Sequence, residues 1–325
     1  MAIVAQVQPI EVKRIYTTQA EGVDRQKLKA MLEDLNRQGR LTERDERLLE
    51  YLHEVNVLSL DQVQRLLWSG AKLVTAYQRL RFLLNHYLLN AARVPRAGMT
   101  AWGLLVSKVY ALGPAGQLWL KEEVSSSHVT RHLKRDQVLH DLLVAELCVR
   151  LTEATLRRGE AWSLAWAGER AASFYPREGE GPALAPDGLG MVRQQRANKT
   201  ATLPFLIEVD ASREAHGRPS SDWGRKIIGY DRFYTSEWKQ HPELMNLATF
   251  PLVAVVTHGE QRLQNLAGAI TEHRRQPVLY YLALWEDLLA GEDLLAAPAW
   301  LIVTPEGKLV DQERGQRQPL LQVGK

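Results

Sequence analysis

Hydrophobic residues in the first third of the chain recur at helical spacing. Leu48, Leu49, Leu52 and Val55 lie on one face of a helix. Thr42 precedes them and is a good N-cap residue. This stretch therefore predicts an amphipathic helix that begins just after residue 42.

Two more helices are predicted before residue 86. Ser59 is a second N-cap, and the short apolar stripe behind it ends at Ser69–Gly70, a helix-breaking pair. A third helix is expected over residues 72–85. Its expected buried residues are Val74, Tyr77, Leu80, Leu83 and Leu84. Its expected exposed residues are Thr75, Gln78, Arg79 and Arg81.

Apolar stretches at residues 87–89 and 106–112 predict two strands, and the segment 93–103 between them contains glycine and proline. Three helices followed by such a hairpin are typical of a winged helix-turn-helix with its wing tip at 93–103. Residues 1–40 carry a helical patch at 25–36 and form either an arm or a dimerisation element.

The second half alternates strands and helices. The helix expected over residues 135–155 is apolar nearly all round, so it must be buried. Strands are expected at 161–167, 189–192, 203–209, 250–257, 278–284 and 300–303, with helices after the third and fourth of them. This order predicts an α/β layer fold with a mixed central sheet.

Four segments follow from these patterns, and the main boundary falls at residues 125–130. They are an N-terminal arm at 1–40, a winged-helix domain at 41–125, an α/β domain at 130–310 and a tail at 311–325.

Composition excludes several classes of protein. Of the 325 residues 45% are hydrophobic and 24% charged, which excludes wholesale disorder. The lone cysteine, Cys148, excludes a disulfide framework and a cysteine-rich zinc site. Residues 1–10 lack the basic and apolar regions of a secretory signal, and no apolar run reaches the roughly 20 residues of a membrane span. We therefore expect a cytoplasmic protein with no membrane contact.

The net charge of +3 hides an uneven distribution. Residues 1–140 carry +6 and residues 141–325 carry −3. The window 71–110 contains six basic residues and no acidic one, which indicates a surface for a polyanion. The alternatives are a basic face without a partner and a winged helix that binds protein. The candidate DNA-binding residues are Lys72, Thr75, Gln78, Arg79, Arg81, Arg93 and Arg96.

Carboxylates at two expected strand ends suggest a metal site. Glu208 and Asp210 are two apart on one strand and so point to the same face. A neighbouring strand starting at Asp187 would add a third carboxylate, and oxygen ligands favour Mg²⁺ or Mn²⁺. Lys226, on the following helix, could orient a water molecule. In the alternative, Asp187 is the turn residue of a Pro-Asp-Gly sequence and the other two are strand-end charges.

Further polar residues fall in apolar surroundings. His140 and Glu146 lie on the long apolar helix, and a buried Glu must be paired, be near a metal or reach a polar edge. Tyr230 and Tyr234 follow Lys226 at helical spacing. They are either nucleophiles of a covalent relaxase or a helix face packed on the sheet.

The order of these parts resembles the replication-relaxation family of plasmid and mobile-element proteins, over about residues 41–305. The N-terminal pieces that carry the resemblance are Arg44–Asp45, Leu48–Leu49, Gln62–Val63, Leu66–Leu67, Tyr77–Leu80, Leu83 and Tyr110–Gly113 with Gly116 and Leu120. The later pieces are His140–Leu142, Pro186–Asp187, Leu206–Asp210, Lys226 with Tyr230, Leu252–Thr257, Trp285–Leu289 and Trp300.

The resemblance implies a winged helix followed by a restriction-endonuclease-like domain of the PD-(D/E)xK kind. Its metal-binding carboxylates would fall on Asp187 and Glu208, with Glu146 as the acidic residue of the first helix. The position two after Glu208, usually Lys, is Asp210 here. Either Lys226 has replaced that lysine, or the site has lost catalysis and serves only DNA binding.

The leading hypothesis is a DNA-binding protein that nicks or relaxes origin DNA with Mg²⁺ or Mn²⁺. Asp187, Glu208 and Asp210 would hold the metal, Lys226 would assist, and His140, Glu146 and Tyr230 would support the site. The alternative is a non-catalytic DNA-binding regulator or adaptor of plasmid replication or transfer. The expected partners are double-stranded DNA, replication or conjugation proteins and a second copy of the chain.

Overall fold

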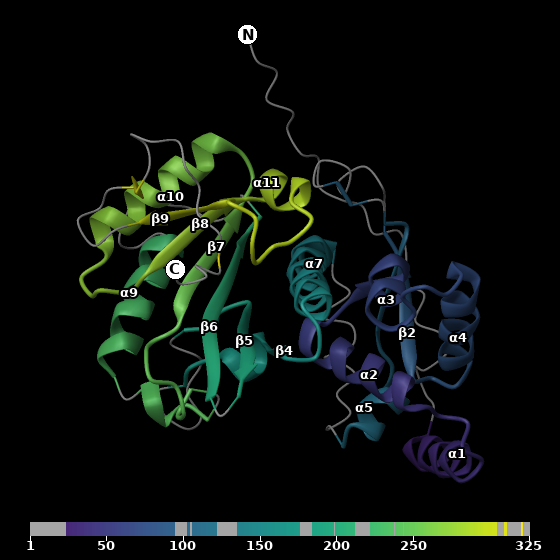
Figure 1. Cartoon of the computed structure of the whole chain (residues 1–325). Helices are drawn as coiled ribbons and strands as arrows, with labels where there is room; N and C mark the ends of the chain where they lie inside the picture. Colours follow the sequence, from purple (N-terminus) through teal and green to yellow (C-terminus); the bar gives the residue numbers. More distant parts are fainter. Residues whose placement is uncertain are drawn as a thin grey trace. The chain divides into compact units, whose positions relative to one another are not determined.

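The computed structural model describes most of the chain between residues 24 and 320 (Figure 1). The described residues are 24–94, 103–104, 106–121, 135–175, 184–197, 199–211, 222–236, 238–242, 244–303, 309–310 and 320. Contacts divide the chain into two units, residues 1–149 and 150–325. The division falls inside one helix, α7. The predicted boundary at 125–130 lies in a stretch outside the described residues and stays a prediction.

The first unit is built mainly of helices with a small sheet. Its elements are α1 (Arg25–Arg37), α2 (Glu43–Val55), β1 (Leu58–Ser59), α3 (Leu60–Leu67), α4 (Leu73–Asn85), β2 (Leu89–Arg93), β3 (Lys108–Leu112), α5 (Pro114–Trp119) and the first part of α7 (Arg135–Arg157). The sheet has the order β1-β3-β2 and is antiparallel.

Side chains at the two predicted N-caps begin α2 and α3. Thr42 and Asp45 form a reciprocal capping box at the start of α2. Ser59 and Gln62 do the same for α3. Each box satisfies backbone N–H groups that the first turn of a helix leaves unpaired. Both predicted helix starts are confirmed.

The buried face of α4 differs from the predicted one. Ala76, Leu80 and Leu83 are buried, whereas Val74 and Tyr77 are 53% and 44% exposed. With about 3.6 residues per turn, the three buried positions define one stripe and Val74 falls on the opposite side. The prediction that Val74 and Tyr77 lie in the core was wrong, because it overlooked the small residue Ala76.

The first of the two predicted strands is longer and later than expected, whereas the second begins two residues later and ends at residue 112 as expected. β2 runs from Leu89 to Arg93 and pairs with β3 from Leu112 back to Lys108. The predicted wing tip falls almost wholly outside the described residues, and Arg96 lies there too.

A seven-stranded mixed sheet forms the second unit. Its order is β10-β9-β8-β7-β6-β5-β4, and the pairs β6–β7 and β7–β8 are parallel. The strands are β4 (Trp162–Gly168), β5 (Gly188–Arg196), β6 (Lys199–Asp210), β7 (Leu252–Thr257), β8 (Tyr280–Leu284), β9 (Trp300–Val303) and β10 (Leu309–Val310). The helices are α8 (Glu169–Ala172), α9 (Asp222–Thr235), the short η3 (Trp238–Gln240), α10 (Glu260–His273) and α11 (Trp285–Ala290).

Helices α9 and α10 cover one face of this sheet (Figure 1). They connect the three parallel strands, and their buried residues form one core with alternate strand residues such as Leu206, Val253 and Leu282. The predicted mixed sheet with helices is confirmed. The winged-helix and restriction-endonuclease-like classes stay predictions.

Cys148, on α7, is buried at 1% exposed and is in no disulfide with a described residue. Among the described residues, no helix is long and apolar enough to cross a membrane.

Candidate functional site

Three predicted site residues meet near the end of β6, in the second unit. Lys226, on α9, places its Nζ 2.6 Å from Oε2 of Glu208. The hydroxyl of Tyr230, one turn later, donates to the other oxygen, Oε1, at 2.6 Å. Glu208 is completely buried, so this carboxyl is held by two donors from one helix face.

Asp187 lies beside this group because β5 runs antiparallel to β6. Its backbone N–H donates to the carbonyl of Ile207, and its Oδ2 accepts the N–H of Val209 at 2.6 Å. The residues that flank Glu208 on β6 therefore fix Asp187. The Asp187 carboxylate is close enough to raise the pKa of Glu208.

The surroundings of Glu208 raise the pKa of its carboxyl. Burial raises the pKa of the Glu208 carboxyl from 4.5 to about 7, while the Lys226 ammonium lowers it and the Asp187 carboxylate raises it. Burial also raises the pKa of Tyr230 well above its ordinary value of 10.0. A phenol that is fully buried and hard to ionise is a poor nucleophile for DNA, which favours the packing interpretation of Tyr230. Tyr234 packs its ring against Phe250, in agreement with that interpretation.

Asp210 is bound differently from the other two carboxylates. Arg262, on α10, donates from Nε to Oδ2 at 2.5 Å and from Nη2 to Oδ1 at 2.9 Å. The hydroxyl of Thr257 also donates to Oδ2. Sequence reasoning missed Arg262 and Thr257, although a buried carboxylate signals that a cationic partner must exist.

Among the described residues, the neighbouring carboxylates of Asp187 and Glu208 are the pair that a divalent cation could use. Across the described part of the chain, no three His, Cys, Asp or Glu side chains gather into a group that could hold a metal ion. The Glu208 carboxyl bonds to residues of α9, whereas the Asp210 carboxylate bonds to Arg262 on α10. Two carboxylates that repel one another supply the oxygen ligands that Mg²⁺ or Mn²⁺ prefers.

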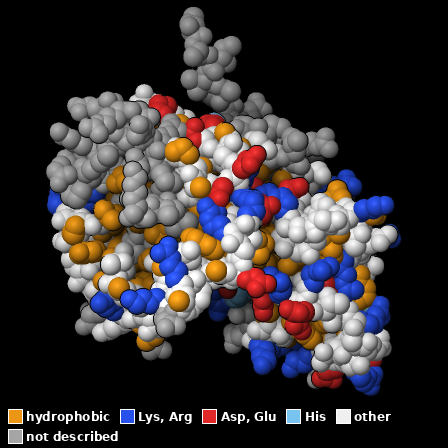
Figure 2. All heavy atoms as spheres, viewed as in Figure 1, with side chains coloured by type: hydrophobic (Ala, Val, Ile, Leu, Met, Phe, Trp, Pro, Cys, Tyr) orange, Lys and Arg blue, Asp and Glu red, His pale blue; other side chains and the backbone are white. Residues whose placement is uncertain are grey.

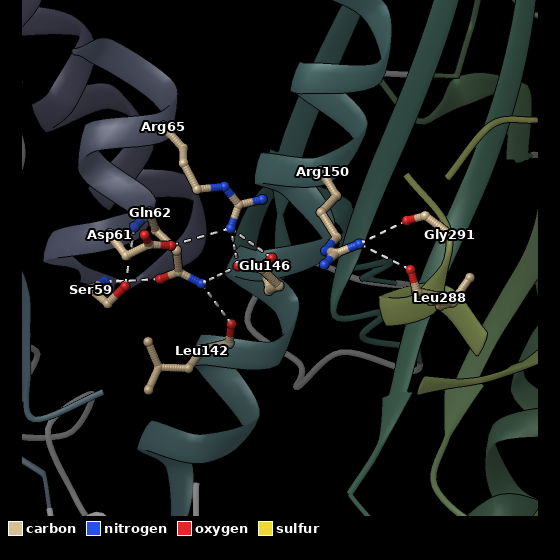
Figure 3. A network of polar contacts seen from close by, with 9 residues as sticks. All are labelled: Ser59, Asp61, Gln62, Arg65, Leu142, Glu146, Arg150, Leu288 and Gly291. Atoms are coloured by element: carbon tan, nitrogen blue, oxygen red, sulfur yellow. Dashed lines mark hydrogen bonds and ion pairs between the residues drawn. The ribbon is translucent and has the colours of Figure 1, made fainter. Parts of the chain in front are cut away.

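Glu146 belongs to a different network, within the first unit (Figure 3). Arg65 donates to Oε1 and Oε2 of Glu146 at 2.8 and 3.0 Å, and Gln62 donates to Oε2 at 3.1 Å. Both partners come from α3. Glu146 is thus a paired buried carboxylate, and every partner of it that Figure 3 draws lies on α3. His140 lies on the same helix, with its Nδ1 3.5 Å from a carboxylate oxygen of Asp141.

The predicted DNA-binding residues of α4 are mostly exposed. Lys72, Thr75, Gln78 and Arg81 all present their side chains to solvent. Figure 2 shows Lys and Arg side chains intermixed with hydrophobic ones on the side of the first unit that carries α4. The exposed apolar residues there include Leu73, Val74 and Tyr77.

Arg79 is the exception on α4. Its Nε donates to Oδ1 of Asp45 at 2.7 Å, and its Nη2 donates to Oδ2 of Asp45 and to the carbonyl of Arg40. The Asp45 side chain is 1% exposed. These bonds use the guanidinium to join α2 to α4, so the structure gives Arg79 an internal role where sequence reasoning expected DNA contact.

Basic residues also face one another where β2 ends and β3 begins. Arg93 on β2 pairs in register with Lys108 on β3. Burial lowers the pKa of Lys108, and the charge of Arg93 lowers it further. Two like charges side by side favour an anion between or above them.

One comparison with known proteins identified a match. The family model described as replication-relaxation matches residues 49–246, which is more than half of the chain. No curated protein and no solved structure matches the chain.

Proposed function

The chain belongs to the replication-relaxation family, and we propose that it binds double-stranded DNA and nicks or relaxes it at a site formed by Asp187, Glu208 and Lys226. Family membership indicates a role in the replication or transfer of plasmids or mobile elements. The nuclease proposal is carried by the contact of Lys226 with Glu208 beside Asp187.

The first unit would supply DNA binding as a winged helix. α3 and α4 follow one another as a helix-turn-helix, and the β2–β3 hairpin comes next along the chain. Exposed Gln78 and Arg81 are side chains able to bond base edges or phosphates. Arg93 and Lys108 at the hairpin would contact phosphate oxygens.

The second unit would supply the chemistry. Asp187 and Glu208 would hold a divalent cation, which supplies a bound water of lowered pKa and neutralises charge on the phosphodiester. Lys226 donates to Glu208 and would orient the attacking water or offset charge on the phosphate. Tyr230 fixes the Glu208 carboxyl from the opposite oxygen.

A metal-dependence assay on supercoiled plasmid carrying the cognate origin tests this proposal. With Mg²⁺ the protein should convert the plasmid to open circle, and EDTA should abolish the conversion. Asp187→Asn, Glu208→Gln and Lys226→Ala should each lower the nicking rate by about 100-fold or more, while affinity for DNA stays within about twofold. Arg225→Ala, an exposed neighbour on α9, is the matched control and should nick normally.

A non-catalytic DNA-binding regulator is the second candidate. This candidate is favoured because both carboxyl oxygens of Glu208 already accept hydrogen bonds, one from Lys226 and one from Tyr230. This candidate predicts tight DNA binding by all four variants, with no open circle formed in Mg²⁺ or Mn²⁺. That outcome would reject the nuclease proposal and retain DNA binding.

A further inference from the structure

A cavity of about 790 Å³ opens in the first unit between the start of α2, the end of α3 and one side of α4. Buried Trp68 and half-buried Phe82 form part of its floor. Exposed Arg44 and Arg47 of α2 line one wall. The cavity opens to solvent and its lining is part polar and part apolar, so it is a place where a ligand can lie.

Aromatic rings that line this cavity contact three arginines, of which Arg44 and Arg79 line it as well. The guanidinium carbon of Arg44 lies 5.4 Å from the centroid of Trp68. Those of Arg79 and Arg40 lie 4.3 and 4.9 Å from the centroid of Phe82. Stacking on a ring restricts a long side chain, so less rotamer entropy is lost when an anion binds.

The charge of the cavity is positive. Arg79 is neutralised by Asp45, and Glu43 contributes the acidic group of the lining. Neither Arg44 nor Arg47 forms an ion pair with any residue that the structure describes. Two guanidinium groups without a carboxylate partner are suited to phosphate oxygens, to which arginine presents a planar fork of donors.

The wall formed by α4 indicates which phosphate-containing ligand the cavity would bind. Thr75 and Gln78 of α4, which we propose to face DNA, line the same cavity as Arg44 and Arg47. A duplex whose groove receives α4 therefore brings one strand to the wall formed by α2. A free phosphate or an acidic peptide would not explain why the two surfaces are continuous.

We propose that Arg44 and Arg47 bind the phosphodiester backbone of the DNA strand that flanks α4. This inference rests on the proposed DNA binding of the first unit and extends it to α2. The contact is independent of base sequence, because phosphates carry no sequence information. Arg44 and Arg47 are surrounded by acidic residues in the sequence, so the net charge of this stretch does not indicate a DNA contact.

The test measures the affinity of the full chain for a short duplex of mixed sequence by fluorescence anisotropy over a series of salt concentrations. Each phosphate contact that is lost should lower the slope of log K against log salt by about 0.9. We expect the double variant Arg44→Ala/Arg47→Ala to lose about 2 from the slope and more than tenfold in affinity at low salt. Arg44→Lys/Arg47→Lys should keep most of the slope. Arg37→Ala, an exposed arginine of α1 outside the cavity, should keep all of it.

The outcomes separate the two proposals. If the wild-type protein binds and Gln78→Ala or Arg81→Ala weakens binding, but the Arg44/Arg47 double variant keeps the wild-type slope, the cavity does not hold DNA. If the wild-type protein does not bind duplex DNA, both proposals fall. Denaturant unfolding of each variant identifies any loss of affinity that comes from misfolding. If the double variant misfolds, the charge-reversed variant Arg47→Glu is measured in its place. A decrease of more than 1 in its salt slope supports the proposal, and an unchanged slope contradicts it.

Discussion

The buried carboxylates of this protein differ in the residues to which they bond. Asp210 meets Arg262, Glu146 meets Arg65, and Glu208 meets Lys226 and Tyr230. Asp210 and Glu146 sit in paired, structural settings. Glu208 differs because Asp187 adds a second negative charge beside it.

The raised pKa of Glu208 makes stability depend on pH. Its pKa is 4.5 when the chain is unfolded and about 7 in the folded state, so the folded protein binds the extra proton. The resulting stabilisation is complete below pH 4.5 and is lost as pH rises through 7. At about 1.4 kcal/mol per pKa unit it amounts to about 3 kcal/mol.

We therefore expect Glu208→Gln to remove this pH dependence. Denaturant unfolding in EDTA from pH 4.5 to 8 should show the wild-type free energy of unfolding falling relative to that of the variant. The difference reports Glu208 together with the charges of Lys226 and Asp187 that act on it, and titrating groups far from the site cancel. A constant difference across that range would show that Glu208 ionises normally.

Sequence patterns predicted the carboxylates of the site and the α9 residues beside them, but not the arginines that pair with the other buried carboxylates. Glu208 and Asp210 are indicated by their place at the end of an apolar strand, and Lys226 and Tyr230 by helical spacing. Arg262 and Arg65 are 52 and 81 positions from the carboxylates they bind. Pairing at such separations is decided by tertiary packing, which no local pattern reports.

At the scale of helices, capping and apolar stripes gave the starts of α2 and α3 correctly. The buried face of α4 was misassigned because Ala76 contributes to the core although it is small. Arg79 was misassigned for the opposite reason. Its place among exposed residues indicated DNA contact, yet Asp45 on α2 is buried and requires a positive partner.

The pair of Arg79 with Asp45 should be worth more to stability than any exposed arginine of α4. Arg79→Ala leaves the buried Asp45 carboxylate without its cation, and we expect a loss of about 3 kcal/mol in the free energy of unfolding. Arg81→Ala, two residues further along α4 in exposed surroundings, should change stability by less than about 0.5 kcal/mol and should weaken DNA binding.

Denaturant unfolding and anisotropy on the same two variants measure both quantities. Equal stabilities would mean that Arg79 is free to contact DNA, as the sequence alone suggests. A stability loss for Arg79→Ala with near-normal affinity for DNA at low temperature would establish its internal role.

For the whole chain, the near-neutral charge of +3 combines a basic first part with a slightly acidic second part. The order of elements along the chain was readable because helices and strands here carry strong apolar periodicity. The pairing order of the sheet could not be predicted from these patterns. β5 and β6 form a long antiparallel hairpin whose outer halves are exposed and polar, so they lack the apolar pattern of a buried strand. The boundary between units was also hidden, because it falls inside the continuous helix α7.

The buried thiol of Cys148 can be used to measure how often α7 becomes exposed to solvent. A thiol is labelled only when it reaches solvent, so the labelling rate of the native protein equals the intrinsic rate multiplied by the fraction of molecules in which this part of α7 is exposed. Since Cys148 belongs to the same unit as Arg79, the Arg79→Ala variant should label about 100-fold faster, the factor that 3 kcal/mol represents. Equal labelling rates would mean that α7 opens independently of the contact between α2 and α4.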